Sequence, residues 1–363
     1  MNRTLAASAL MGLALSPTLA TPARADFELE GELIDVVDMH LHPGHYANMA
    51  PNGRRFITES LPPFARMYAP ALIETLLDPY GEHVGIIEQT RMAGVDHAVL
   101  FAVYTPRTTG FYANDELERV LASDANDAGD GTPWAWGMVS VNYEDWDAGP
   151  LAEARYAALS SYFEQRPDLF IGIKLAHAHQ AVTFDDSRYL GVYDVAARYE
   201  VPVLLHTGFS PFPGSQTDPA YYDPQGLEPV VTAYDGAHGM PRVDFVLSHV
   251  GQGDARAVAH ALDLAAAHDN VWLEISALGR PFLIDEEGMP VSGTEPQYPE
   301  VLAEIRARGL VSRTLFATDG PQFSGMVRSY VMRMATGMRD AGYSIAEIRS
   351  VMGQNFYRLY FGS

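Results

Sequence analysis

The sequence contains no cysteine and only one lysine. The absence of cysteine excludes disulfide bonds, thiolate zinc sites, iron–sulfur clusters and a cysteine nucleophile. Its 24 basic residues stand against 46 acidic ones, which gives a formal net charge of −22. A surface of this sign repels a phosphate backbone, so we do not expect a nucleic-acid partner. All other residues among these 24 are arginine, and this asymmetry suggests a chemical role for the single lysine, Lys174.

A long apolar run is present only at the start of the chain. Residues 1–25 have the features of a secretory signal peptide: Arg3 supplies a basic start, Leu5–Leu15 an apolar stretch, and Ala23-Arg24-Ala25 a cleavage motif. Prolines and threonines interrupt the stretch before it reaches the roughly 20 apolar residues of a membrane anchor. We expect the mature chain, residues 26–363, to be periplasmic or secreted, with no membrane association after cleavage.

Short apolar runs alternate with segments of helical period through the rest of the chain. Eight runs are apolar on both alternating faces, as strands buried on two sides should be: Leu33–Met39, His97–Val103, Trp134–Val141, Phe170–Leu175, Val201–Leu205, Val243–Ser248, Val271–Ile275 and Thr314–Ala317. Helices are expected between and after them, over His83–Met92, Asn114–Ser123, Leu151–Gln165, Tyr189–Tyr199, Asp254–Ala267, Pro299–Arg308, Val327–Ala341 and Ile345–Met352.

This alternation predicts one α/β domain, a (β/α)8 TIM barrel over residues 26–363 with long βα loops. A doubly wound open sheet would need a glycine-rich phosphate turn after the first strand, where His40-Leu41-His42-Pro43-Gly44 stands instead. The long loops expected at the C-terminal face of the barrel are Pro43–Leu77, Thr105–Tyr112, Phe209–Gly226 and Gly279–Gln297.

The residues that end the predicted strands carry metal-binding side chains. Active sites of such barrels lie at the C-terminal ends of the strands, so these side chains should converge on one rim. Residues i and i+2 of a strand point to the same side, so two neighbouring histidines can chelate one ion from inside the barrel. Imidazoles and a carboxylate suit Zn²⁺ or a similar divalent ion. The side chains that should converge there are His40, His42, Lys174, His206, His249 and Asp319, and the four histidines and the aspartate are candidate metal ligands.

Together these motifs resemble the amidohydrolase superfamily, and in particular its amidohydrolase-related (amidohydrolase 2) branch, which includes pyrone-dicarboxylate lactonase and the aminocarboxymuconate and resorcylate decarboxylases. The resemblance extends from Leu33 to Tyr360. It is carried by Asp38-Met39-His40-Leu41-His42, Gly172-Ile173-Lys174-Leu175, Val203–Gly208, Leu247-Ser248-His249-Val250-Gly251, Phe316-Ala317-Thr318-Asp319 and the tail Gly353–Tyr360.

The resemblance implies a metal-dependent hydrolase that opens a lactone, ester or amide bond of a small molecule with metal-activated water. Asp319 would accept the proton of the water and deliver it to the leaving group, and His249 would either ligate a second metal or polarise the substrate carbonyl. Asp38 would either hold a ligand imidazole or act directly. The alternative is a metal-dependent decarboxylase, a lyase that acts on an aromatic or enoic acid. A binding protein without activity is disfavoured because every ligand position is filled.

The role of Lys174 decides whether one or two zinc ions per chain are expected. In binuclear relatives such as phosphotriesterase and dihydroorotase, a lysine on the fourth strand is carboxylated and bridges two ions. An amine can form that carbamate, whereas a guanidinium is charged at every accessible pH and cannot replace it. The other interpretation is that Lys174 pairs as a cation with a carboxylate of the substrate or the core.

Three further residues are assigned to substrate binding. Relatives often place a histidine directly after Lys-Leu; here the segment reads Lys174-Leu175-Ala176-His177, and His177 is assigned by analogy. Arg107 follows the second strand and Arg280 the seventh, where each could bind an acidic group. The expected partner is a small-molecule substrate, which the sequence does not identify. The sequence is also compatible with a homo-oligomer.

Overall fold

Eight parallel strands form a nearly closed barrel in the computed structural model, which describes residues 27–60, 63–72, 83–129, 131–143, 146, 150–278, 298–320 and 324–362. The order around the barrel is β12-β11-β10-β9-β8-β7-β4-β3, and every adjacent pair is parallel. The strands are β3 (Val37–Leu41), β4 (His97–Phe101), β7 (Ala135–Val139), β8 (Phe170–Leu175), β9 (Val203–His206), β10 (Phe245–Ser248), β11 (Val271–Glu274) and β12 (Thr314–Leu315). The predicted TIM-barrel fold is confirmed.

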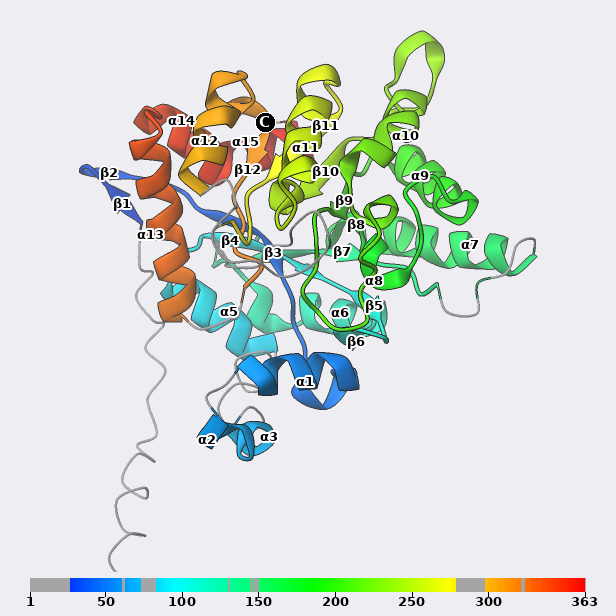
Figure 1. Ribbon diagram of the computed structural model, residues 1–363, viewed down its shortest axis with the longest axis horizontal. Coiled ribbons are helices and arrows are strands. Elements are labelled where there is room, and N and C mark those ends of the chain that lie inside the picture. Colours follow the sequence, from blue (N-terminus) through cyan, green and yellow to red (C-terminus); the bar gives the residue numbers. More distant parts are fainter. Residues whose placement is uncertain are drawn as a thin grey trace, which may run out of the picture.

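Helices follow the strands and surround the barrel (Figure 1). Those of the repeating units are α5 (His83–Met92), α6 (Asn114–Leu121), α7 (Pro150–Gln165), α9 (Ser187–Tyr199), α10 (Glu228–Ala233), α11 (Ala255–Ala267), α12 (Tyr298–Ala307) and α13 (Ser324–Asp340). The chain ends with α14 (Ile345–Arg349), a π-helical turn (Ser350–Gln354) and α15 (Asn355–Phe361). Within the described residues, no helix combines the length and hydropathy that a membrane span requires.

The long βα loops contain elements that the sequence did not predict. The first loop holds α1 (Pro51–Ser60), α2 (Pro63–Arg66) and α3 (Ala69–Leu72), which lie together outside the ring of helices (Figure 1). The second holds the hairpin β5 (Val103–Thr105) and β6 (Gly110–Tyr112), and α8 (His177–Gln180) follows β8. The proposed signal peptide and the loop 279–297 lie outside the described residues.

The predicted start of the first strand at Leu33 is wrong. Leu33 belongs to a separate antiparallel hairpin, in which β1 (Glu28–Leu29) pairs with β2 (Glu32–Leu33), and 63% of it is exposed. The barrel strand begins at Val37, which is 1% exposed. An apolar run that crosses the turn between a hairpin and a strand cannot reveal the boundary by composition alone.

Side chains fill the interior of the barrel. Apolar residues from the strands and from the segment after β12 pack there with Phe356 of α15: Val37, Met39, Val99, Phe101, Trp136, Met138, Ile171, Leu204, Val246, Trp272, Leu315 and Ala317. Most of the residues that alternate with these along the strands face outward, where they form a second apolar cluster between the sheet and the helices. The interior is therefore a packed core, as in other TIM barrels, and it closes the barrel below the strand ends.

The barrel closes between β3 and the segment after β12, and we call this contact the seam. Its backbone contacts are the Met39 N–H donating to the carbonyl of Phe316 (3.3 Å) and a parallel bridge between Leu41 and Gly320. The buried carboxyl of Asp38 adds to them: Oδ1 accepts from the Thr318 N–H (2.9 Å) and Oδ2 from the Thr318 hydroxyl (2.6 Å). Oδ1 also accepts from the His40 N–H, at 3.2 Å. Asp38 therefore holds the backbone on both sides of the seam.

Replacing Asp38 with asparagine should destabilise the protein by about 1–3 kcal/mol. Oδ1 of Asp38 accepts from the backbone N–H groups of Thr318 and His40, so an amide nitrogen in this position faces two donors. In the Oδ2 position it forces the buried Thr318 hydroxyl to turn and accept, and the hydroxyl proton loses Asp38 as its acceptor. Chemical denaturation of both proteins measures the difference. The control is Asp218→Asn, because Asp218 is an exposed cap that accepts from the N–H of Ala220, and asparagine caps equally well. Equal losses in the two variants would contradict the role of Asp38.

Candidate metal centre

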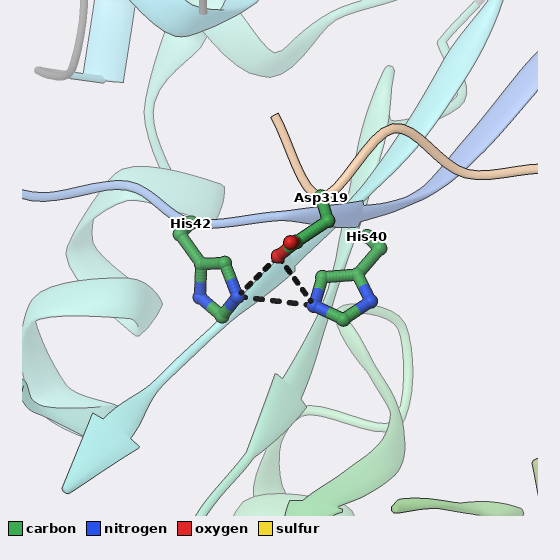
Figure 2. A group of neighbouring side chains, drawn as sticks. All are labelled: His40, His42 and Asp319. Atoms are coloured by element: carbon green, nitrogen blue, oxygen red, sulfur yellow. Dashed lines mark hydrogen bonds and ion pairs between the residues drawn. The ribbon is translucent and has the colours of Figure 1, made fainter. Parts of the chain in front are cut away.

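Three predicted ligands meet at the seam. The Nε2 atoms of His40 and His42 lie 3.0 Å apart. Oδ1 of Asp319 is 3.3 Å from the first and 3.4 Å from the second. Figure 2 shows both imidazoles, from the end of β3, turned toward the Asp319 carboxylate, which comes from the segment after β12. The expectation that His40 and His42 point to the same side is confirmed.

The spacing of these three atoms fits one divalent ion. Zinc–nitrogen and zinc–oxygen bonds of about 2.0–2.1 Å in tetrahedral geometry place the donor atoms about 3.3 Å from one another. The Nδ1 atom of His40 bonds Oε2 of Glu274 at 2.8 Å, which leaves Nε2 as the ligand atom. A carboxylate behind a ligand imidazole is the usual outer support of a metal site. Burial, followed by the charge of Lys174, lowers the pKa of His40 well below its usual value, and the neutral ring is the form that binds metal.

His206 lies in the same cluster of rings. It ends β9, and its ring centroid is 4.9 Å from those of His179 and His249. Burial lowers its pKa well below the usual range, so the ring is neutral. Its Nε2 atom is buried, and within the described part of the chain it has no hydrogen-bond partner. A buried ring nitrogen without a hydrogen-bond partner is costly, and a metal ion bound to its lone pair would satisfy it.

Lys174 reaches the cluster from β8. Its ammonium donates to the Ser248 hydroxyl at 3.2 Å and lies 5.2 Å from the centroid of the Phe101 ring. The same ring contacts His40, with a centroid distance of 4.7 Å. Burial lowers the pKa of the Lys174 ammonium, and the carboxylates of Glu274 and Asp319 oppose this shift. A lowered pKa increases the share of neutral amine, which is the form that reacts with CO₂.

Left-handed backbone conformations surround the centre. After β10, His249 has φ 66° and Val250 φ 51°; after β11, Ala277 has φ 59°; and after β12, Asp319 has φ 53°. Such angles are uncommon for residues other than glycine, and for a β-branched valine they are strained. Strain of this kind persists where surrounding contacts impose it, and it concentrates at functional sites.

The structure adds Glu274, Ser276 and His179, which the sequence analysis overlooked. Glu274 is fully buried at the end of β11, and the ligand atoms of His40, His249 and Glu274 lie within 4.8 Å of one another. The signal for Glu274 in the sequence was its position as an acidic residue at the end of an apolar run. His179 lies beside His206, and its Nδ1 is 2.8 Å from the Thr108 hydroxyl.

The three residues assigned to substrate binding have different outcomes. His177 is fully buried, with its ring 4.2 Å from Phe184 and 4.3 Å from Tyr189 between centroids, so the structure places it in the core rather than on the rim. His179 takes the place beside the ligands that the family analogy gave to His177. Arg107 is exposed on the turn between β5 and β6, and its role stays a prediction. Arg280 lies outside the described residues.

Replacing His206 with alanine should weaken the binding of Zn²⁺ by more than the roughly 10–100-fold that loss of an outer hydrogen-bond partner costs. The reason is that the variant removes the buried Nε2 atom itself. Isothermal titration of the metal-depleted protein measures the affinity. The control is His268→Gln, because His268 follows α11 and pairs with Glu228 away from the cluster. Unchanged affinity in His206→Ala would show that His206 is not a ligand.

Comparisons with known proteins agree with this architecture. No curated protein matches the chain in sequence. Among solved structures, an uncharacterized TIM-barrel protein from Bordetella bronchiseptica is similar with a TM-score of 0.59 and 16% identity, covering 90% of this chain and 98% of the other. A probable 2-pyrone-4,6-dicarboxylic acid hydrolase from Acinetobacter baumannii gives a TM-score of 0.56 and 12% identity, with 90% and 99% covered. The 5-carboxyvanillate decarboxylase of Sphingomonas paucimobilis gives a TM-score of 0.52 and 14% identity, covering 90% of this chain and 99% of the other.

At these identities the structural similarities establish the fold alone. Membership rests on the family model, which is described as amidohydrolase and matches residues 37–362. The match begins at β3 and ends directly after the last helix, so it includes every strand of the barrel and both clusters of His, Asp and Glu side chains at the strand ends. The chain therefore belongs to the amidohydrolase family.

Proposed function

We propose that this protein is a metal-dependent hydrolase that cleaves a lactone, ester or amide bond of a small molecule. The observation that supports the proposal most is the triangle of His40 Nε2, His42 Nε2 and Asp319 Oδ1, with sides of 3.0, 3.3 and 3.4 Å. A divalent ion held there would polarise a carbonyl and lower the pKa of a bound water.

The residues of the chain supply the rest of the chemistry. Asp319 is partly exposed, with 20% of its side chain accessible, so its carboxylate can reach both the ion and a water molecule. It would take the proton of that water as general base and return it to the leaving group as general acid. Phe101 and the core beneath it exclude bulk water from below, which strengthens the electrostatic interactions of the site.

Decarboxylation of an aromatic or enoic acid at the same centre is the second candidate. It is favoured by the similarity to the Sphingomonas decarboxylase, whereas the similarity to the Acinetobacter protein favours hydrolysis. Both reactions use a divalent ion, so the same ligand residues would serve either of them. We further propose export of the protein, on the basis of residues 1–25, and zinc as the ion, on the basis of its nitrogen and oxygen ligands.

A paired substrate screen separates the two reactions. The purified protein, loaded with Zn²⁺, is offered a panel of lactones, esters and amides and a panel of aromatic acids. Hydrolysis of the first panel is read as release of acid or amine, and decarboxylation of the second as release of CO₂. Activity lost on chelation and restored by metal supports the proposal. Turnover of the acids alone would replace it with the lyase, and activity that survives complete metal removal would overturn both.

A further inference from the structure

The first βα loop carries an exposed apolar segment, residues 63–72, which comprises α2, α3 and the turn between them and which we call the arm. Phe64 is 79% exposed, Met67 76% and Tyr68 57%. Because a large aromatic side chain covers about 150–250 Å², these three together expose about 400 Å². This is the size of the largest apolar patch on a typical monomer, and such patches mark interaction surfaces.

The loop around the arm is positively charged, whereas the chain as a whole has a formal net charge of −22. Residues 51–72 contain three arginines, Arg54, Arg55 and Arg66, and one acidic residue, Glu59. Arg66 is exposed on the arm, and 67% of the Arg55 side chain is accessible. An apolar surface with arginines beside it fits an acidic partner, because opposite potentials attract at the encounter. A second copy of this acidic chain is such a partner.

A surface with complementary features lies on the hairpin β5–β6 and the start of α6, and we call it the acceptor. Phe111 of β6 is 41% exposed. Asp115 and Glu116 follow it in the first turn of α6. The acceptor therefore offers an apolar ring beside two carboxylates, which match the apolar side chains and the arginines of the arm.

The helix α1 separates the arm from the acceptor of the same chain. At its first turn, the Asn52 amide donates to the carbonyl of Arg107 in the hairpin, at 2.7 Å. At its last turn, the Glu59 carbonyl accepts from the Arg66 guanidinium of the arm, at 3.0 Å. The ten residues of α1 span about 15 Å between these contacts. Figure 1 shows α1 between α2 and α3 on one side and the hairpin on the other.

We propose that the arm docks on the acceptor of a second copy of this chain, and that the two copies exchange arms around a twofold axis that crosses α1. Such an axis brings each arm to the other copy's acceptor, so the contact forms twice and the assembly closes as a dimer. Two arms pressed against surfaces of equal area would bury about 1,600 Å², the size of a standard stable interface. Neither metal nor substrate takes part, so the dimer can be tested independently of the proposed function.

A lipid surface is the competing occupant of the arm, because aromatic and arginine side chains also favour a membrane interface. The charge of the whole chain opposes it, since anionic headgroups repel an acidic protein. The carboxylates of the acceptor, in contrast, attract the arginines of the arm. The second copy is therefore the better match.

Analytical ultracentrifugation of the purified protein over a wide range of concentrations tests the dimer. We expect a reversible dimer that high salt weakens, because salt screens the opposite charges. Met67→Glu removes apolar contact area and places a carboxylate against the acidic acceptor. Since the contact occurs twice, the dissociation constant should rise by about 100-fold or more. Met67→Lys should have a smaller effect, because its charge is attracted to the acceptor.

The control is Met240→Glu, which makes the same change at a methionine that is 50% exposed and lies outside the arm and the acceptor. It should leave the dissociation constant unchanged. A monomer at every concentration, or equal effects of the changes at Met67 and Met240, would overturn the proposal. Equal effects of lysine and glutamate at Met67 would contradict the match of charges.

The acceptor is tested with Phe111→Ser, which should weaken the dimer although it lies at the other end of α1. A mixture of the Met67→Glu and Phe111→Ser proteins keeps one intact pair of arm and acceptor, so it should dimerise more tightly than either variant alone. An unaffected dimer in Phe111→Ser would show that the arms contact one another instead. Binding of the monomer to phosphatidylglycerol vesicles, lost in Met67→Glu, would assign the arm to a lipid surface and reject the second copy.

Discussion

Replacing Asp319 with asparagine should lower kcat by about 10²–10⁴-fold or more, because Asp319 is both the proposed general base and a metal ligand, and substrate should still bind. The Oδ1 atom of Asp319 lies 3.3 and 3.4 Å from the Nε2 atoms of His40 and His42, so the carboxylate adjoins the place of an ion. An amide cannot accept a proton at neutral pH. Steady-state kinetics on a substrate from the screen, with metal content measured on the same samples, determine the effect.

The control for Asp319 is a second aspartate paired with a histidine. Asp223 contacts Nδ1 of His260 at 2.8 Å and caps the turn at Gln225, so Asp223→Asn makes the same chemical change outside the ligand cluster. Its kcat should stay within about twofold, because asparagine also caps well. If Asp319→Asn changed only KM, the carboxylate would bind substrate rather than move a proton.

Replacing Lys174 with arginine should abolish turnover if the lysine is carboxylated and bridges two ions. Arginine cannot form a carbamate and leaves a permanent positive charge in the cluster. At about 4 Å and an effective dielectric constant near 20, each unit of like charge costs about 4 kcal/mol, so the second ion should be lost. Metal analysis and kinetics on one preparation measure both effects. If Lys174 acts only as a cation, arginine should keep much of the activity and all of the metal.

Two further substitutions separate carbamate chemistry from packing. Lys174→Met keeps an unbranched side chain over Phe101 but has no amine, so it should lose the second ion and keep the fold. Lys174→Ala opens space for a small anion, and bicarbonate or acetate should restore part of its activity. Native metal content and near-native turnover in Lys174→Arg would exclude the binuclear interpretation and leave a mononuclear site.

The strands and most helices could be predicted because burial imposes a simple pattern. A strand covered on both faces must be apolar along its length, and the run Phe170–Leu175 matches β8 residue for residue. The helices α1 to α3 could not be predicted in the same way. The helices α2 and α3 have four residues each, too few to show a helical period, and Phe64 of α2 is 79% exposed. The helix α1 begins with Pro51-Asn52-Gly53, residues that are typical of turns.

The part of the candidate site that lies at the strand ends could be predicted from the sequence. His40, His42 and Asp319 meet because parallel strands place their C-terminal residues on one rim. The partner of His40 was not predictable, because β3 and β11 are not neighbours and only side-chain conformations bring Glu274 to it. The exchange of His177 for His179 has a geometric cause. On a strand both would face one way, but on α8 residues two apart lie about 200° apart around the axis.

The seam gives the proposed ion a mechanical role. His40 and His42 stand on one side of it and Asp319 on the other, while few backbone hydrogen bonds join the two sides. An ion that binds all three side chains ties the first strand of the barrel to the last. Metal binding and ring closure are then linked equilibria, so an ion present at 100 times its Kd stabilises the closed ring by about 2.7 kcal/mol. Chelation should accelerate hydrogen exchange at the amide of Met39 well before the outer helices unfold.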